Sequence, residues 1–183
     1  TGADKARLEA MQPRAQFQVA RCLILLKRYA DAATRCDMAM QQFPNSPYTW
    51  DLYLLQARAL LDANRLDDAI NALNKLLVGI NKDKYEFQQN HAMLLLGRAL
   101  ALAKNKDQVR QGVARFYQLI EFNSIERSPE LQPIIEAAYL DIAKAYAALG
   151  DSTEAEKYQS RYLHKFPQGL YRREIMQLPA ARF

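Results

Sequence analysis

Apolar residues recur along the chain at helical spacing, in four segments that share one pattern. Each segment has a small residue near its start and an apolar residue seven positions later, and each follows another apolar helical stretch. Apolar positions three and four residues apart form one face of a helix, so the pattern predicts pairs of helices. The four segments are residues 29–44, 66–81, 107–123 and 152–167.

The composition agrees with a helical protein. Among 183 residues there are only six glycines and seven prolines, and Val is sparse beside abundant Ala, Leu, Gln and Arg, which favours helix over strand. The most apolar run, residues 22–26, is too short to cross a membrane as a helix. A helix pair of this length cannot bury its apolar face alone, so we expect neighbouring pairs to stack.

Small and bulky residues recur at matching places in the pairs. In residues 136–167 they are Tyr139, Ile142, Ala143, Tyr146, Gly150, Ala155 and Pro167. In residues 13–46 they are Ala20, Ala32, Cys36, Ala39 and Pro44. In residues 50–81 they are Trp50, Tyr53, Ala57, Leu60, Ala69 and Leu73. On these residues the chain resembles the tetratricopeptide repeat (TPR) family, a helix pair of 34 positions in which small residues at positions 8 and 20 let the helices nearly touch.

The third pair departs from the pattern. Gly97 takes position 8, but the next matching small residue, Gly112, comes fifteen residues later instead of twelve. We interpret the difference as a lengthened turn at residues 104–106, with Asp107 as the N-cap of the second helix. Position 27 holds Leu119 where the family has Ala.

The resemblance implies an all-α fold, a right-handed α-α superhelix in a single domain, residues 1–183. It comprises about four repeats, a partial N-terminal repeat and a C-terminal capping helix. Residues 3–12 resemble the second helix of an earlier repeat, ending at Pro13. The predicted parts are the partial repeat 1–12, repeats 13–46, 47–82, 83–123 and 130–167, and the capping helix 168–177.

The resemblance also implies a binding face, because the first helix of each TPR pair lines a concave groove. Position 9 of the four repeats carries a cation each time, and position 5 carries an apolar residue one turn away. A cationic row beside an apolar row suits a partner protein or peptide with acidic residues or a free carboxylate. The predicted partner-binding residues are Arg21, Arg58, Arg98 and Lys144 at position 9, and Phe17, Leu54, Leu94 and Leu140 at position 5.

Two alternatives bear on this face. Instead of binding a partner, position 9 is also explained as a solvent-exposed position, where the aliphatic part of each cationic side chain lies along apolar neighbours and its charge stays in water. Co-chaperone TPR domains clamp a C-terminal carboxylate with Lys at position 5 and Asn at position 9 of the first repeat. Here those positions hold Phe17 and Arg21, so we do not expect a chaperone-tail adaptor.

The sequence contains no motif for nucleic-acid binding, metal binding or catalysis. The net charge of +5 is scattered, with adjacent basic pairs only at 27–28 and 172–173, so we expect no nucleic-acid partner. His91 and His164 lack any ligand-spaced cluster, and there is no phosphate loop or nucleophile motif. We therefore predict no catalytic residues, no metal and no cofactor. The oligomeric state is left open.

Cys22 and Cys36 fall on opposing helices of the first pair near their turn. This placement allows them to lie close enough to form a disulfide, which would indicate an oxidising compartment. They are equally explained as unpaired thiols packed as small hydrophobes.

Two junctions extend the resemblance. Residues 43–49 (FPNSPYT) and 166–174 (FPQGLYRRE) share an aromatic-Pro start and a Tyr, which is similar to bacterial envelope TPR proteins such as the outer-membrane barrel-assembly lipoprotein and the Tol-linked cell-division coordinator. We therefore expect a non-enzymatic scaffold in a bacterial envelope assembly, periplasmic or outer-membrane-associated rather than cytoplasmic. The alternative is an accessory or regulatory TPR domain of a larger enzyme or secretion component, with which the half-repeat at 3–12 agrees.

Overall fold

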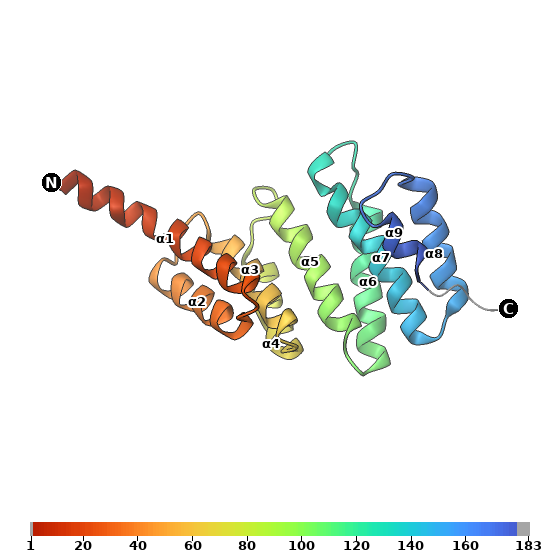
Figure 1. The fold of residues 1–183 in the computed structure, drawn as a ribbon. Helices are drawn as coiled ribbons and strands as arrows, with labels where there is room; N and C mark the ends of the chain where they lie inside the picture. Colours follow the sequence, from red (N-terminus) through yellow and green to blue (C-terminus); the bar gives the residue numbers. More distant parts are fainter. Residues whose placement is uncertain (1, 179–183) are drawn as a thin grey trace. The chain divides into compact units, whose positions relative to one another are not determined.

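The structure, a computed structural model, describes the chain from residue 2 to residue 178, with side chains from residue 11 onward. Within this range every regular element is a helix, and neighbouring helices pack as pairs (Figure 1). The predicted all-α, TPR-like fold class is confirmed. The helices are α1 (Gly2–Leu25), α2 (Tyr29–Gln42), α3 (Thr49–Asp62), α4 (Leu66–Gly79), α5 (Glu86–Ala101), α6 (Lys106–Phe122), the short 3-10 helix η1 (Pro129–Leu131), α7 (Gln132–Leu149), α8 (Ser152–Lys165) and α9 (Arg172–Met176).

The chain divides into two compact units, residues 1–88 and residues 89–183. The boundary falls in the first turn of α5, so α1 to α4 belong to the first unit and α6 to α9 to the second. The single superhelical domain expected from the sequence stays a prediction.

In the first unit the predicted small residues lie where the helices touch. Ala20, Ala32, Ala57 and Ala69 are fully buried. Around them two apolar clusters form, one centred on Leu60 between α2, α3 and α4, and one that joins α1, α2 and α3. Close approach at the alanines is therefore what lets α1 to α4 share a core.

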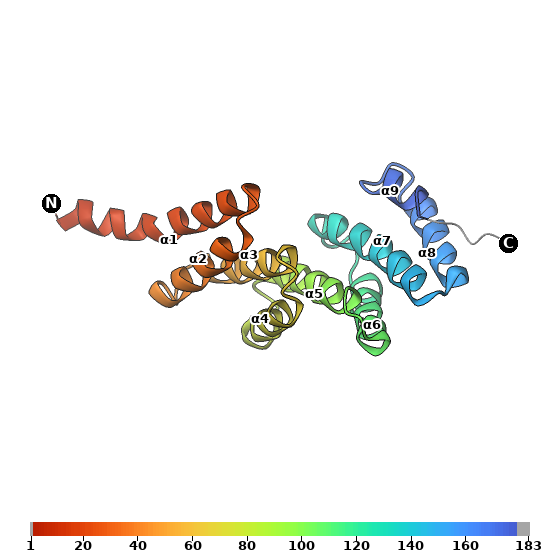
Figure 2. The same ribbon diagram turned by 60° about the horizontal axis from the view of Figure 1, so that its bottom comes forward.

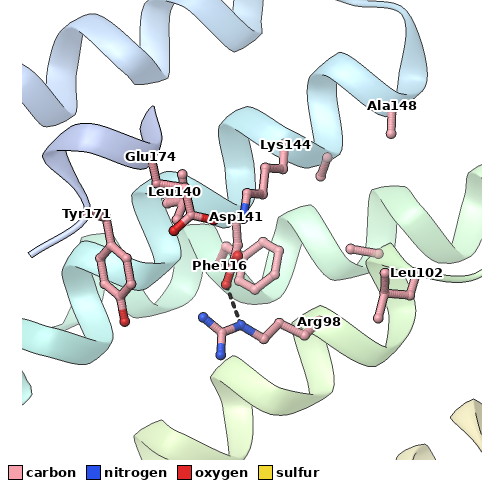
Figure 3. A pocket seen from close by; sticks show the side chains of 11 residues that line it. Arg98, Leu102, Phe116, Leu140, Asp141, Lys144, Ala148, Tyr171 and Glu174 are labelled. Atoms are coloured by element: carbon pink, nitrogen blue, oxygen red, sulfur yellow. Dashed lines mark hydrogen bonds and ion pairs between the residues drawn. The ribbon is translucent and has the colours of Figure 1, made fainter. Parts of the chain in front are cut away.

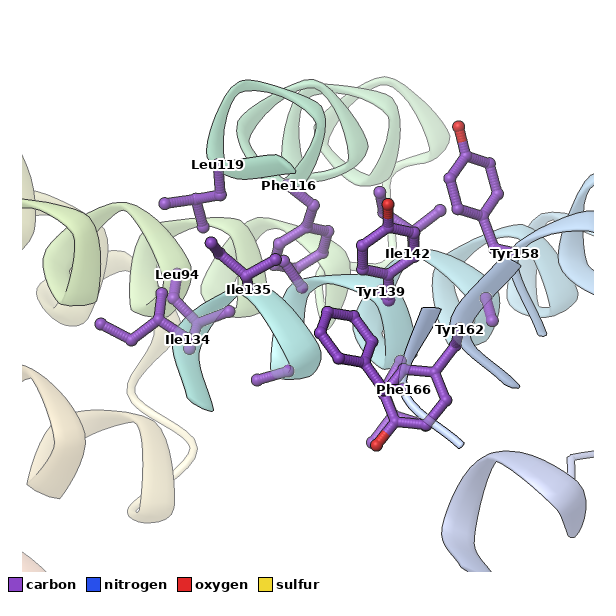
Figure 4. Close-up of a cluster of buried hydrophobic side chains, with 14 of the residues drawn as sticks. Leu94, Phe116, Leu119, Ile134, Ile135, Tyr139, Ile142, Tyr158, Tyr162 and Phe166 are labelled. Carbon is purple, nitrogen blue, oxygen red and sulfur yellow. The ribbon is translucent and has the colours of Figure 1, made fainter. Parts of the chain in front are cut away.

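In the second unit one cluster dominates, made from α5, α6, α7, α8 and α9 (Figure 4). Its aromatic members include Phe116, Tyr139, Tyr158 and Tyr162, which are all buried. The close approach of α5 and α6 depends on two glycines, because a Cβ on Gly112 would lie 2.6 Å from the carbonyl oxygen of Gly97. The two glycines thus allow the helices of the irregular third pair to approach closely.

Two predicted boundaries are wrong. The helix expected to end before Pro13 continues through it, so residues 3–12 and the first helix of the first repeat form one helix, α1 (Figure 2). Proline removes one backbone hydrogen bond, but its fixed φ is helical, so a helix continues through it at a cost of about 3 kcal/mol. The second helix of the third pair begins at Lys106, and its N-cap is Asn105, whose side chain accepts from the Asp107 N–H at 2.8 Å.

The ends of the fourth pair also differ from expectation. The capping helix is shorter than residues 168–177, since α9 covers Arg172–Met176 only. Before α7, η1 adds one tight turn, and Leu131 from this turn is buried in the main cluster. The turn between α7 and α8 is closed by Gly150 at φ 83°, a left-handed conformation that favours glycine.

Candidate functional site

A pocket of about 420 Å³ lies within the second unit, between α5, α6, α7 and the segment that leads into α9 (Figure 3). The charged groups lie toward one end together with Leu140, and Leu102 and Ala148 lie toward the other. The lining residues are Arg98, Ala101, Leu102, Phe116, Leu140, Asp141, Lys144, Ala145, Ala148, Tyr171 and Glu174.

Three of the predicted partner-binding residues meet in this pocket. Arg98 of α5 and Lys144 of α7 are the residues predicted at position 9 of the third and fourth repeats, and Leu140 of α7 is the residue predicted at position 5 of the fourth. One helical turn separates Leu140 from Lys144, so both face the same side of α7. The pocket therefore joins part of the predicted cationic row to part of the predicted apolar row.

Arg98 is held in an ion pair that the sequence pattern did not predict. Its Nε donates to Oδ2 of Asp141 at 2.6 Å, and the two side chains are only 29% and 12% exposed. Burial raises the pKa of the Asp141 carboxyl above its ordinary value, and the guanidinium of Arg98 opposes that rise. Because Asp141 is poorly solvated, Arg98 contributes to keeping it ionised.

Lys144 forms a second, more exposed ion pair. Its Nζ donates to Oε1 of Glu174 at 2.6 Å, with the side chains 42% and 51% exposed. Exposed pairs of this kind add about 0–1 kcal/mol to stability. Lys144 is therefore accessible to another carboxylate at little energetic cost.

Part of the chain matches a known family. The tetratricopeptide repeat model matches residues 14–46 and residues 137–169. The chain carries tetratricopeptide repeats. These two repeats correspond to the α1–α2 pair from residue 14 onward and to the α7–α8 pair, and no curated protein matches the chain. That α3–α4 and α5–α6 are further tetratricopeptide repeats stays a prediction, as does the envelope type.

The predicted residues of the first unit do not take part in this pocket. Arg58 pairs with Asp62 of its own helix at 2.9 Å, and Arg21 bonds Gln18 at 3.4 Å and lies 5.9 Å from the centroid of the Phe17 ring. Phe17 is half-buried and stacks on Tyr48 at 5.8 Å between ring centroids. These groups lie on the surface of the first tetratricopeptide repeat and of α3.

The predicted apolar row is mostly inside the protein. Leu54, Leu94 and Leu140 are buried, and Leu94 and Leu140 belong to the main cluster of the second unit. Of the three, only Leu140 also lines the pocket. Position 5 thus supplies packing, while the exposed apolar surface at the pocket comes from Leu102 and Ala148 at position 13.

The two cysteines are unpaired in the structure. Cys22 is exposed on α1, whereas Cys36 is buried in α2. Burial, with a smaller effect from Asp37, raises the pKa of the Cys36 thiol to about 12, so this thiol stays protonated. Cys36 fits the description of a thiol packed as a small hydrophobe, and Cys22 does not.

A buried carboxylate positions the C-terminal side of the pocket. Glu136 of α7 is fully buried, and its Oε2 accepts from the hydroxyl of Tyr162 at 2.7 Å and from the N–H of Leu170 at 2.6 Å. The same hydroxyl accepts from the N–H of Tyr171 at 2.8 Å. These bonds fix the segment that carries Tyr171 and Glu174 to the pocket. The signal in the sequence was one acidic residue inside the apolar run of residues 134–140.

A second cavity of about 390 Å³ lies in the first unit, between α2, α3 and α4. Its lining is mostly polar and includes Arg65 and Asp68, which pair with each other at 2.7 Å. Among the described side chains, those of residues 11–178, no cluster of three His, Cys, Asp or Glu is placed to bind a metal ion. None of the helices in that range is long and apolar enough to span a membrane.

Proposed function

We propose that this protein is a non-enzymatic scaffold that binds a partner protein or peptide through the first helices of its repeats. Tetratricopeptide repeats generally mediate protein–protein interaction and are typically non-catalytic. The observation that carries the proposal is the pocket of the second unit, whose lining comes largely from positions 5, 9, 12 and 13 of neighbouring first helices.

The partner is expected to carry acidic residues. Arg58 and Lys144 are the two predicted cations whose side chains combine substantial exposure with an exposed intrachain partner. In such a pair a partner carboxylate can replace the intrachain carboxylate at little cost in free energy, because both charges are already solvated. Arg98 is a weaker choice as a mobile contact, since its pair with Asp141 is partly buried.

The test is capture of the partner by the tagged full-length protein from cells of its own organism. Reversing the charge in Arg58→Glu and Lys144→Glu should reduce capture of the same partner at least fivefold, with unchanged far-UV circular dichroism. Lys157→Glu is the matched control, because Lys157 is about as exposed as Lys144 (45% against 42%), pairs with Glu154 at 2.7 Å and lies outside the pocket. Equal capture by all three variants would contradict the proposal.

The resemblance of the two junctions supports a finer proposal, a role in a bacterial cell-envelope assembly. The measurement is fractionation of cells that produce the full-length protein, followed by detection in the cytoplasmic, periplasmic and membrane fractions. Recovery with the periplasm or the outer membrane is expected. Recovery in the cytoplasm alone would leave the scaffold proposal standing and remove the envelope role.

A further inference from the structure

We propose that the pocket of the second unit recognises a partner segment in which an acidic side chain and an aliphatic side chain are three or four residues apart. This inference rests on the proposed scaffold function and names the chemistry of the partner. It follows from which donors the pocket leaves unused, where its apolar surface lies and how far apart the two are.

The charged end of the pocket has hydrogen-bond donors to spare. Arg98 uses only Nε in its bond to Asp141, and its Nη1 and Nη2 make no hydrogen bond with any residue in the described range. The hydroxyl of Tyr171 is likewise without a hydrogen bond to a described residue, and it faces the guanidinium (Figure 3). A guanidinium held in place by one carboxylate, with its two terminal nitrogens open, suits a second carboxylate.

The accessible charges favour an acid over a base. Asp141 is 12% exposed and already accepts from Arg98, so it has little surface to offer an incoming cation. Lys144 is 42% exposed, and within residues 11–178 its one ion pair is with Glu174, so a partner carboxylate reaches it by replacing one exposed acceptor with another. Arg98 then offers its terminal nitrogens to the partner carboxylate from a fixed position, and Lys144 exchanges Glu174 for that carboxylate.

The opposite end of the pocket is apolar. Leu102, which follows α5, is 63% exposed, and Ala148 of α7 lines the same end of the pocket (Figure 3). Ala145 and Phe116, which are both buried, add further apolar surface to the pocket lining. An aliphatic side chain placed here would cover the exposed surface of Leu102 and gain hydrophobic stabilisation.

The distance between the two ends argues for two side chains. Asp141 and Ala148 are seven residues apart on one helix, which corresponds to about 10 Å at 1.5 Å per residue. A single terminal residue, whose carboxylate and side chain share one Cα, does not span that length. Two residues one helical turn apart, with their side chains extended, do.

The probe is a fluorescein-labelled helical peptide, blocked at both ends, with one Glu and one Leu four residues apart in an Ala and Gln background. Its binding to the full chain is followed by fluorescence anisotropy. We expect replacement of its Glu by Gln, or of its Leu by Ala, to weaken binding at least fivefold. On the protein, Lys144→Gln and Leu102→Ser should each do the same.

Two matched variants separate the pocket from the general surface. Lys157→Gln removes an equally exposed paired lysine, and Leu25→Ser removes another exposed leucine, and neither residue lines the pocket. Both should bind the peptide as the parent does. Equal weakening by Lys144→Gln and Lys157→Gln, no binding of the blocked peptide, or binding only of a peptide with a free C-terminal carboxylate would each overturn the inference.

The two proposals fail in different ways. If partner capture depends on Lys144 but the blocked peptide does not bind, the recognition inference is wrong and the scaffold function stands. If the peptide binds in a Lys144-dependent manner but no partner protein is captured, the pocket chemistry stands and the scaffold function is wrong.

Discussion

Gly169 lies where the chain passes closest to the buried Glu136. A Cβ at this position would lie 2.6 Å from Oε2 of Glu136 and 2.8 Å from Cβ of Phe166, and would also meet the hydroxyl of Tyr162. Only glycine therefore lets the backbone approach closely enough for the N–H of Leu170 to reach the carboxylate.

Gly169→Ala should lower the free energy of unfolding by about 1–3 kcal/mol, because the added methyl group overpacks this contact. Urea unfolding followed by circular dichroism measures the change. Leu170→Ala is the control, since the Leu170 side chain is exposed and its removal should cost less than about 0.5 kcal/mol. Equal effects of the two substitutions would show that Gly169 is not sterically required.

Arg98→Ala should lower the free energy of unfolding by about 1–3 kcal/mol at pH 7, because it leaves the largely buried Asp141 without its partner. Without Arg98 the folded-state pKa of Asp141 rises further above that of the unfolded chain. The folded state then binds a proton more tightly, so the loss of stability shrinks as pH falls through the raised pKa.

Urea unfolding of Arg98→Ala and the parent at pH 7 and at about pH 5 gives this pH dependence. Lys144→Ala is the comparison, and it should cost less than about 0.5 kcal/mol because its pair with Glu174 is exposed. A loss for Arg98→Ala that grew toward low pH would contradict the assigned role of Arg98.

At the scale of elements, the α7–α8 repeat depends on small residues where its helices meet. Ala143 and Ala155 are buried at the matching positions 8 and 20 of this tetratricopeptide repeat. The same helix presents Ala148 to solvent, so α7 offers both a packed and an open alanine. Comparing substitutions at Ala143 and Ala148 therefore separates the effect of steric crowding from that of helix propensity.

Ala143→Leu should lower the melting temperature, with a cost of about 1–3 kcal/mol, because three added carbons do not fit between α7 and α8. Ala148→Leu on the same helix should leave stability nearly unchanged. Differential scanning calorimetry of both variants provides the measurement. If Ala143→Leu melts at the parent's temperature, the assigned register of the fourth repeat is wrong.

At the scale of the whole molecule, the second unit carries its own core. The cluster of Figure 4 draws its buried residues from α5 to α9, and both ion pairs of the pocket are internal to this unit. Its two helix pairs and capping helix are few for a repeat protein, because stacked repeats stabilise one another. The C-terminal segment bonded to Glu136 adds the buried Ile175 to the same core.

We expect a fragment of residues 83–183 to unfold cooperatively in urea and to keep the Lys144-dependent peptide binding of the full chain. The reason is that every residue of the pocket and of the main cluster lies within it. Circular dichroism and anisotropy test the two parts. A fragment that lacked a cooperative transition would show that residues 1–82 are needed for the fold of the second unit.

The sequence by itself determined the helix pairs and their points of contact. Local periodicity defines helices, and small residues such as Ala32 and Gly97 mark where two helices approach, so neither needs knowledge of the distant chain. Two predictions from the sequence were wrong: the helix end before Pro13 and the N-cap of α6. A helix can end before a proline or continue through it, and more than one nearby polar residue can serve as a cap.

Only the tertiary structure decided which charges face one another. Arg98 and Asp141 are 43 residues apart and Lys144 and Glu174 are 30 apart, so neither ion pair is implied by spacing along a helix. Packing likewise buried Glu136 beneath the C-terminal segment and turned Leu54 and Leu94 inward. The sequence predicted a row of cations, and the packing of the helices determined that Arg98 is fixed by a largely buried acid while Lys144 stays accessible.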